Sequence, residues 1–193
     1  MNRFEIVAAL FGVVSVFLSV RQNIWSWPTA IVNVGMYIVV FYRSKLYSDT
    51  GLQVVYVVLN FYGWYQWLYG GKNRTELPVT RTSGRLAAIL VVIGAVTAMA
   101  LGTFVSYSTD ASLPYVDALT TSTSLVAQWM MTRKLLENWI VWVSVDVVYI
   151  GMYIYKDLHV TAVLYAVFLA LSVMGYMQWK RTLNAPEAVP VPA

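Results

Sequence analysis

Long apolar runs separated by short polar segments dominate the chain, and they predict a bundle of membrane-spanning helices. Seven such runs are long enough to be helical spans. They cover about Phe4–Val20, Trp25–Tyr42, Gly51–Tyr69, Arg85–Ser106, Tyr115–Thr132, Asn138–Tyr155 and Leu158–Trp179. The first run resembles a signal peptide, but no small-residue cleavage site precedes the polar residues 21–23, so we interpret it as a retained helix.

The sixth run carries an acid among aromatic residues in the middle of an apolar segment. One helical stripe, with spacings of three and four residues, is formed by Trp139, Trp142, Asp146, Tyr149 and Tyr153. An ionisable side chain at mid-membrane costs roughly 3 kcal/mol on insertion scales, and proteins place such groups toward a bundle interior. We therefore expect this stripe to form one wall of a ligand site.

Further polar stripes occur on the second, third and fifth runs. They comprise Ser26, Thr29, Asn33, Tyr37 and Phe41; Gln53, Tyr56, Asn60 and Trp67; and Asp117, Thr120 or Thr121, Ser124 and Gln128. If the stripes meet, they enclose a cavity with aromatic walls, hydroxyls, amides and a carboxylate. The fourth run, residues 85–106, has no internal charge, Asn or Gln, so it is interpreted as a linker helix facing lipid or another subunit.

Two parts of the chain match each other at an offset of 112 residues. The segment Gly63-Trp64-Tyr65-Gln66-Trp67 corresponds to Gly175-Tyr176-Met177-Gln178-Trp179, and Trp27 corresponds to Trp139. The copies start four spans apart, so both cross the membrane in the same direction, which predicts a parallel repeat with the substrate site between the copies. The expected divisions are a first repeat (1–69), a cytoplasmic connector (70–84), a linker helix (85–106), a second repeat (107–181) and a disordered tail (182–193).

Composition and charge agree with a membrane protein. Only 11% of the residues are charged, against roughly 25% in soluble domains. Of the 13 Lys and Arg residues, nine fall on one side of a seven-span topology and four on the other, which predicts a cytoplasmic C-terminus and an external N-terminus. The net charge of +4 is therefore a sign of membrane orientation, and we expect no nucleic-acid partner.

The residue inventory also limits the chemistry. The chain has no Cys and one His, His159, near a predicted loop, so we expect no catalytic residues, no metal site and no cofactor. No Lys or Arg lies in the middle of a span, so a phosphate would lack a counter-charge. The inventory suits a neutral or cationic ring compound. A light receptor is disfavoured because the last span has no Lys before Lys180.

Several side chains also have simpler interpretations. Tryptophan and tyrosine at span ends are often interfacial anchors, the preferred interpretation for Trp25, Trp67, Tyr69 and Trp179. Small hydroxyl residues often serve helix–helix contacts, as expected for Ser15, Ser19, Ser122 and Ser172. The alternatives left open are interhelical hydrogen bonds for Asn33, Asn60 and Gln128, and a structural partner for Asp146. A solvated loop is expected for Arg133, Lys134 and Glu137.

Several motifs resemble the PnuC-type vitamin transporters over nearly the whole chain, from about Phe4 to Arg181. They are Trp25-Ser26-Trp27-Pro28, Lys45-Leu46-Tyr47, Asn60-x-Tyr62-Gly63-Trp64-Tyr65-Gln66-Trp67, Gln128-Trp129-Met130-Met131-x-Arg133-Lys134, Glu137-Asn138-Trp139-x-x-Trp142 and Gly175-Tyr176-x-Gln178-Trp179. The resemblance implies an all-α integral membrane protein with seven transmembrane helices in a SWEET-like 3+1+3 arrangement, assembled as a homotrimer. It also implies facilitated diffusion of nicotinamide riboside, a precursor of NAD, across the bacterial inner membrane, where a cytoplasmic ribosylnicotinamide kinase traps it.

Related transporters carry thiamine or another vitamin, and proton- or sodium-coupled uptake through Asp146 is the alternative mechanism. The expected substrate-binding residues share positions on the polar and aromatic stripes. They are Asn33, Tyr37, Asn60, Ser124, Gln128, Trp139, Trp142, Asp146 and Tyr149.

Overall fold

The computed structural model describes residues 3–43, 47–108, 113–155 and 157–185. Within these residues the structure is helical, with seven α-helices and a short 3-10 turn, η1 (Lys72–Arg74). The α-helices are α1 (Arg3–Val20), α2 (Ser26–Arg43), α3 (Tyr47–Tyr69), α4 (Gly84–Ser108), α5 (Pro114–Thr132), α6 (Asn138–Tyr155) and α7 (His159–Asn184).

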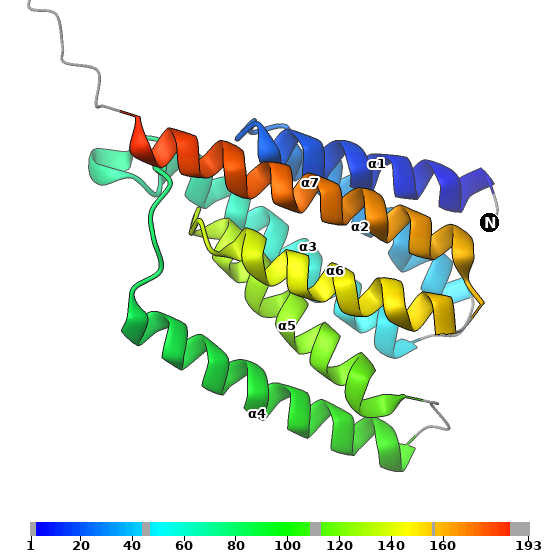
Figure 1. Ribbon diagram of the computed structural model, residues 1–193. Coiled ribbons are helices and arrows are strands. Elements are labelled where there is room, and N and C mark those ends of the chain that lie inside the picture. The colour runs from blue at the N-terminus through cyan, green and yellow to red at the C-terminus, as the bar shows by residue number, and fades with distance from the viewer. Residues whose placement is uncertain (1–2, 44–46, 109–112, 156, 186–193) are drawn as a thin grey trace, which may run out of the picture.

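Six of the helices form a closed ring, and α4 lies outside it (Figure 1). Around the ring each helix packs on the next, in the order α1, α2, α3, α5, α6, α7 and back to α1. Helix α4 packs on α5, and its outer face is apolar and exposed; Val91, for example, is 71% exposed. The expected linker helix is thus peripheral, and the centre of the ring is left to the six helices that carry polar positions.

The helix bounds agree closely with the apolar runs in the sequence. Helix α6 begins and ends at the expected residues, Asn138 and Tyr155. Helix α7 continues to Asn184, so residues 182–184 are helical rather than part of a disordered tail. Thr182 accepts a hydrogen bond from the Gln22 side chain at 3.0 Å, which ties this last turn to the segment after α1. Lys45, Leu46, Lys156 and the tail from residue 186 lie outside the described residues.

By length and composition, four of the described helices are apolar enough to cross a membrane: α1, α4, α6 and α7. Helices α2, α3 and α5 contain 18, 23 and 19 residues, so they have comparable length but lower hydropathy. Polar residues such as Asn33, Asn60 and Gln128 lower the hydropathy of these three helices. All three of these side chains line the cavity inside the ring.

At the connector end of the bundle, residues 70–83 fold against the segment between α5 and α6, although most of them are exposed. Thr80 exchanges backbone hydrogen bonds with Lys134 and Leu136 in the segment between α5 and α6. The Glu137 carboxylate accepts hydrogen bonds from the backbone N–H and the hydroxyl of Thr82, at 2.7 and 2.8 Å. The solvated-loop interpretation is therefore wrong for Lys134 and Glu137, although Arg133 is exposed.

Lys134 is 6% exposed, and its ammonium lies 4.5 Å from the centroid of the Trp67 ring. Burial lowers the pKa of Lys134, because the charged form loses hydration, and the nearby Glu76 carboxylate partly opposes this shift. The cation–π contact compensates for part of the lost hydration.

The interfacial-anchor interpretation is consistent with the exposure of two of the four aromatic residues at span ends and is wrong for the other two. Trp25 and Tyr69 are 66% and 50% exposed, as expected for anchors, whereas Trp67 and Trp179 are 2% and 0% exposed. The buried pair belongs to the hydrophobic core at the connector end, together with Trp27 and Trp139. A residue at the end of a span is therefore not always exposed, because here the ends of several helices pack against one another.

Corresponding backbone hydrogen bonds occur in the two segments that connect α1 to α2 and α5 to α6. The N–H of Gln22 donates to Ser19 at 3.0 Å, and the N–H of Lys134 donates to Met131 at 3.1 Å. Asn23, Ser26 and Trp27 make three further bonds of this kind, and the residues 112 positions later repeat each of them. Gln22 and Lys134 also share positive φ angles, of 55° and 48°.

Candidate functional site

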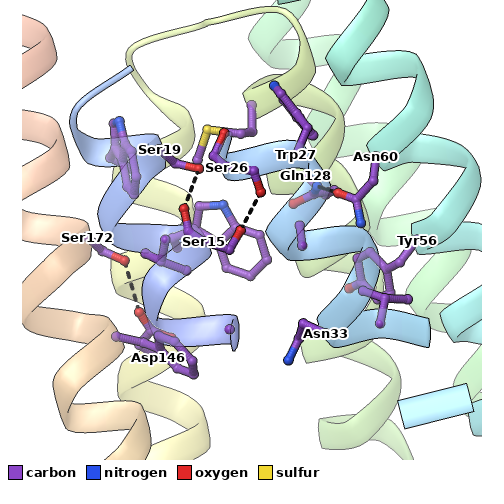
Figure 2. Close-up of a pocket in the computed structure, with 18 of the residues that line it drawn as sticks. Ser15, Ser19, Ser26, Trp27, Asn33, Tyr56, Asn60, Gln128, Asp146 and Ser172 are labelled. Atoms are coloured by element: carbon purple, nitrogen blue, oxygen red, sulfur yellow. Dashed lines mark hydrogen bonds between the residues drawn. The ribbon is translucent and has the colours of Figure 1, made fainter. Parts of the chain in front are cut away.

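A cavity of about 250 Å³ lies inside the six-helix ring (Figure 2). Every ring helix contributes to its wall, and no α4 residue does. The lining residues are Gly12, Ser15, Val16, Ser19, Ser26, Trp27, Ala30, Asn33, Val34, Gln53, Tyr56, Asn60, Gln128, Met131, Trp139, Trp142, Asp146, Tyr165, Phe168 and Ser172. The volume lies just below the range for small-molecule sites, roughly 300–1,000 Å³.

The acid and the amides lie on different sides of this cavity (Figure 2). Asp146 of α6 is 3% exposed, and its carboxylate accepts a hydrogen bond from the Ser172 hydroxyl of α7 at 3.1 Å. Across the cavity, the Gln128 side chain donates to the Asn60 side chain at 2.9 Å, joining α5 to α3. A ligand in the cavity would therefore meet a carboxyl group on one side and an amide pair on the other.

Asn33 makes an interhelical hydrogen bond and also borders the cavity. Its side-chain N–H group donates to the carbonyl of Ala8 at 2.6 Å, which joins α2 to α1. It also lines the cavity, and its Nδ2 lies close to Gly12, where an added Cβ would come within 3.1 Å. The glycine in α1 therefore lets the amide approach the neighbouring helix.

Three buried polar atoms on cavity-lining residues have no hydrogen-bond partner within the described part of the chain. They are the indole Nε1 atoms of Trp27 and Trp139 and the hydroxyl of Ser26. Buried polar groups without partners are costly, so such atoms are candidates for ligand contacts. Trp27 and Trp139 occupy equivalent positions in the two matching parts of the sequence.

Six of the nine expected binding residues line the cavity: Asn33, Asn60, Gln128, Trp139, Trp142 and Asp146. The other three do not line it. Tyr37 stacks on Phe41 with ring centroids 5.7 Å apart, and Tyr149 packs against Tyr165 at 4.8 Å. Ser124 is buried one helical turn before Gln128.

Sequence reasoning did not select several cavity residues as binding residues. Trp27 was recognisable through its equivalence to Trp139, and Gln53 and Tyr56 stood on a polar stripe. Ser15, Ser19 and Ser172 were assigned only to helix contacts. They do make such contacts, for instance from the Ser15 hydroxyl to the Ser26 carbonyl at 2.8 Å, but they also line the cavity.

The lining combines aromatic, amide, hydroxyl and carboxyl side chains. No Lys, Arg or His lines the cavity in the described structure, and Asp146 is its acidic residue. No group of three or more His, Cys, Asp or Glu residues suited to a metal ion occurs among the described residues. The arrangement can hold a polar ring compound through stacking and hydrogen bonds, with Asp146 favouring a positive charge.

Comparison with known proteins agrees with this description. The model of one protein family, described as "Nicotinamide mononucleotide transporter", matches residues 2–181. The nicotinamide riboside transporter PnuC of Escherichia coli (strain K12) is 24% identical over 204 residues, covering 93% of this chain and 85% of the relative. The riboflavin/roseoflavin transporter RibM of Streptomyces davaonensis is 25% identical over 181 residues, covering 91% of this chain and 83% of the relative.

A solved structure titled "Crystal structure of the Vitamin B3 transporter PnuC" superposes with a TM-score of 0.75 at 24% identity, covering 94% of this chain and 82% of that chain. At this identity the match shows a shared fold. Together with the family match over residues 2–181, it shows that this chain belongs to the PnuC family of vitamin transporters, which are multi-pass membrane proteins.

Proposed function

We propose that the protein carries nicotinamide riboside across the bacterial inner membrane by facilitated diffusion. The observation that carries this proposal is the central cavity, which has aromatic walls and one acidic residue, Asp146, and no basic residue among its described lining. Nicotinamide riboside is a planar pyridinium cation with a ribose and a carboxamide. Its ring suits stacking on Trp139 or Trp142, and its hydroxyls and amide suit Asn33, Asn60 and Gln128.

The cavity disfavours two of the alternatives. A nucleotide would bring a phosphate next to Asp146 without a basic side chain to balance it, so the nucleoside fits better than nicotinamide mononucleotide. Riboflavin has three fused rings and no positive charge, so it lacks the cation that Asp146 would favour. Thiamine is also a cationic ring compound, so it is the main alternative substrate.

The proposed topology has all seven helices crossing the membrane as a parallel, SWEET-like 3+1+3 repeat. The corresponding hydrogen bonds at an offset of 112 residues support the repeat. The distribution of Lys and Arg supports a cytoplasmic connector end and C-terminus, with the N-terminus outside. The exposed apolar face of α4 is available for lipid and for the contacts of a homotrimer.

A ligand panel tests the substrate assignment. Calorimetry on purified protein is expected to show binding of nicotinamide riboside, with at least tenfold weaker binding of nicotinamide mononucleotide and riboflavin. Thiamine is included in the panel, and tighter binding of thiamine than of nicotinamide riboside would favour the alternative substrate. The phosphate of the mononucleotide is the only addition to the preferred ligand, so this pair isolates the effect of charge. Equal or tighter binding of the mononucleotide would contradict the proposed charge selection.

The mechanism is tested by uptake into proteoliposomes. Downhill uptake of nicotinamide riboside is expected to continue at an unchanged rate when ionophores collapse the proton and sodium gradients. Accumulation above the external concentration is expected only when a ribosylnicotinamide kinase and ATP are enclosed, because phosphorylation removes the transported form. If collapsing either gradient stops downhill flux, coupled transport through Asp146 replaces facilitated diffusion.

A further inference from the structure

Trp67 at the end of α3 and Trp179 near the end of α7 meet at the connector end of the ring. Their ring centroids are 5.8 Å apart, and both side chains are almost fully buried. They occupy equivalent positions in the two matching parts of the sequence. We refer to this pair as the tryptophan clasp.

Each indole of the clasp is hydrogen-bonded across the boundary between the two three-helix groups. The Trp67 Nε1–H donates to the carbonyl of Met131 on α5 at 3.0 Å. The Trp179 Nε1–H donates to the carbonyl of Ser19 on α1, also at 3.0 Å. Met131 and Ser19 are again equivalent positions, so the two bonds are reciprocal. Separating α1–α3 from α5–α7 at this end breaks both bonds together.

The clasp also supports the wall of the central cavity. Trp27 packs edge-on against Trp67, with centroids 5.2 Å apart and an interplanar angle of 90°. Trp139 packs in the same way against Trp179, at 5.4 Å and 88°. Trp27 and Trp139 line the cavity, whereas the clasp residues stand behind them.

A second hollow, of about 340 Å³, borders Trp67, which does not line the central cavity. Its lining includes Trp67, Glu76 and Lys134, together with residues 22–25 that follow α1. Trp27 belongs to the lining of the central cavity, and Trp67 belongs to the lining of this second hollow. The edge-on rings of Trp27 and Trp67 therefore lie between the ligand cavity and a more polar space at the connector end.

We propose that the tryptophan clasp closes the connector end of the ligand cavity and must open in each transport cycle. The reciprocal hydrogen bonds make the closure a contact between the two three-helix groups rather than a movement of one side chain. In this closed state, Trp67 and Trp179 are positioning residues, because they act on the cavity through Trp27 and Trp139. The inference rests on the proposed transport function.

Cross-linking across the clasp tests this proposal. The sequence contains no cysteine, so a pair of introduced cysteines reacts without background. Gln22 and Thr182 lie on opposite sides of the Trp179–Ser19 bond, and their side chains are 3.0 Å apart. The Gln22→Cys/Thr182→Cys variant is treated in proteoliposomes with a short, reducible bis-methanethiosulfonate. The matched control is Tyr65→Cys/Tyr69→Cys, whose two exposed positions lie on the single helix α3, with ring centroids 5.4 Å apart.

Cross-linking of the first pair is expected to lower nicotinamide riboside flux at least tenfold, with recovery on reduction and with calorimetric affinity unchanged within twofold. The control pair should keep its flux. Unimpeded flux through fully cross-linked protein with normal affinity would overturn the clasp while leaving the transport function intact, and so would loss of affinity on cross-linking. Absence of nicotinamide riboside binding before cross-linking would instead refute the proposed function.

Discussion

The Asp146→Asn variant is expected to lose most nicotinamide riboside uptake while reaching the membrane at the normal level. Asp146 is 3% exposed and lines the cavity, so its carboxyl group has little contact with water. In the proposed complex, Asp146 pairs with the positive charge of the ligand. Removing one member of such a buried charge pair costs roughly 2–5 kcal/mol. The lower value corresponds to a decrease in affinity of about 30-fold for a cationic ligand. Uptake at fixed low substrate concentration and calorimetric affinity measure the loss.

Ser172→Ala is the matched control for this substitution. It removes the hydroxyl that donates to Asp146 at 3.1 Å but leaves the carboxylate in the cavity. A smaller loss than in Asp146→Asn is expected, because a single hydrogen bond to a charged group contributes about 1.5–3 kcal/mol at most. If Asp146→Asn transports near the normal rate, the acid is only a structural partner of Ser172.

The Gly175→Ala variant is expected to lower both thermal stability and ligand affinity. A Cβ at this position would lie 2.5 Å from Cε2 of the Trp139 ring, which leaves no room without moving the ring. Overpacking of this kind costs roughly 1–3 kcal/mol. Gly63→Ala should behave in the same way, because its Cβ would lie 2.2 Å from the Trp27 ring. A thermal-shift assay and calorimetry on the purified variants measure the two effects.

Gly151→Ala provides the control for the glycine substitutions. Gly151 is exposed on α6, and a Cβ there meets nothing within 4 Å. Alanine should therefore raise stability by about 0.5–1 kcal/mol through helix propensity. Equal thermal midpoints for the variants at positions 151 and 175 would show that the close packing of Gly175 against Trp139 is not essential.

The contrast between Lys134 and Asp146 shows when the local sequence pattern predicts the burial of a charged residue and when it does not. Asp146 stands in the middle of an apolar run, so its inward orientation follows from the cost of exposing it to lipid. Lys134 lies between two runs next to Arg133, where a basic residue normally marks a solvated loop. Its burial over Trp67 depends on residues 75–83 folding across the loop, which no local pattern indicates.

The sequence by itself determined the number of helices and most of their bounds. It also placed on the cavity wall two-thirds of the residues that were expected to bind the ligand. Length and hydropathy decide where a helix lies, and the spacing of polar residues decides which face turns inward. It could not determine where helix ends converge. Only the tertiary structure decided that Trp67 and Trp179 meet beside the cavity and that Tyr37, Ser124 and Tyr149 do not line it. The physical reason is that the spacing of residues on a helix gives the direction of each side chain. How deeply that side chain is buried, and which residues it contacts, depends on how six helices close into a ring.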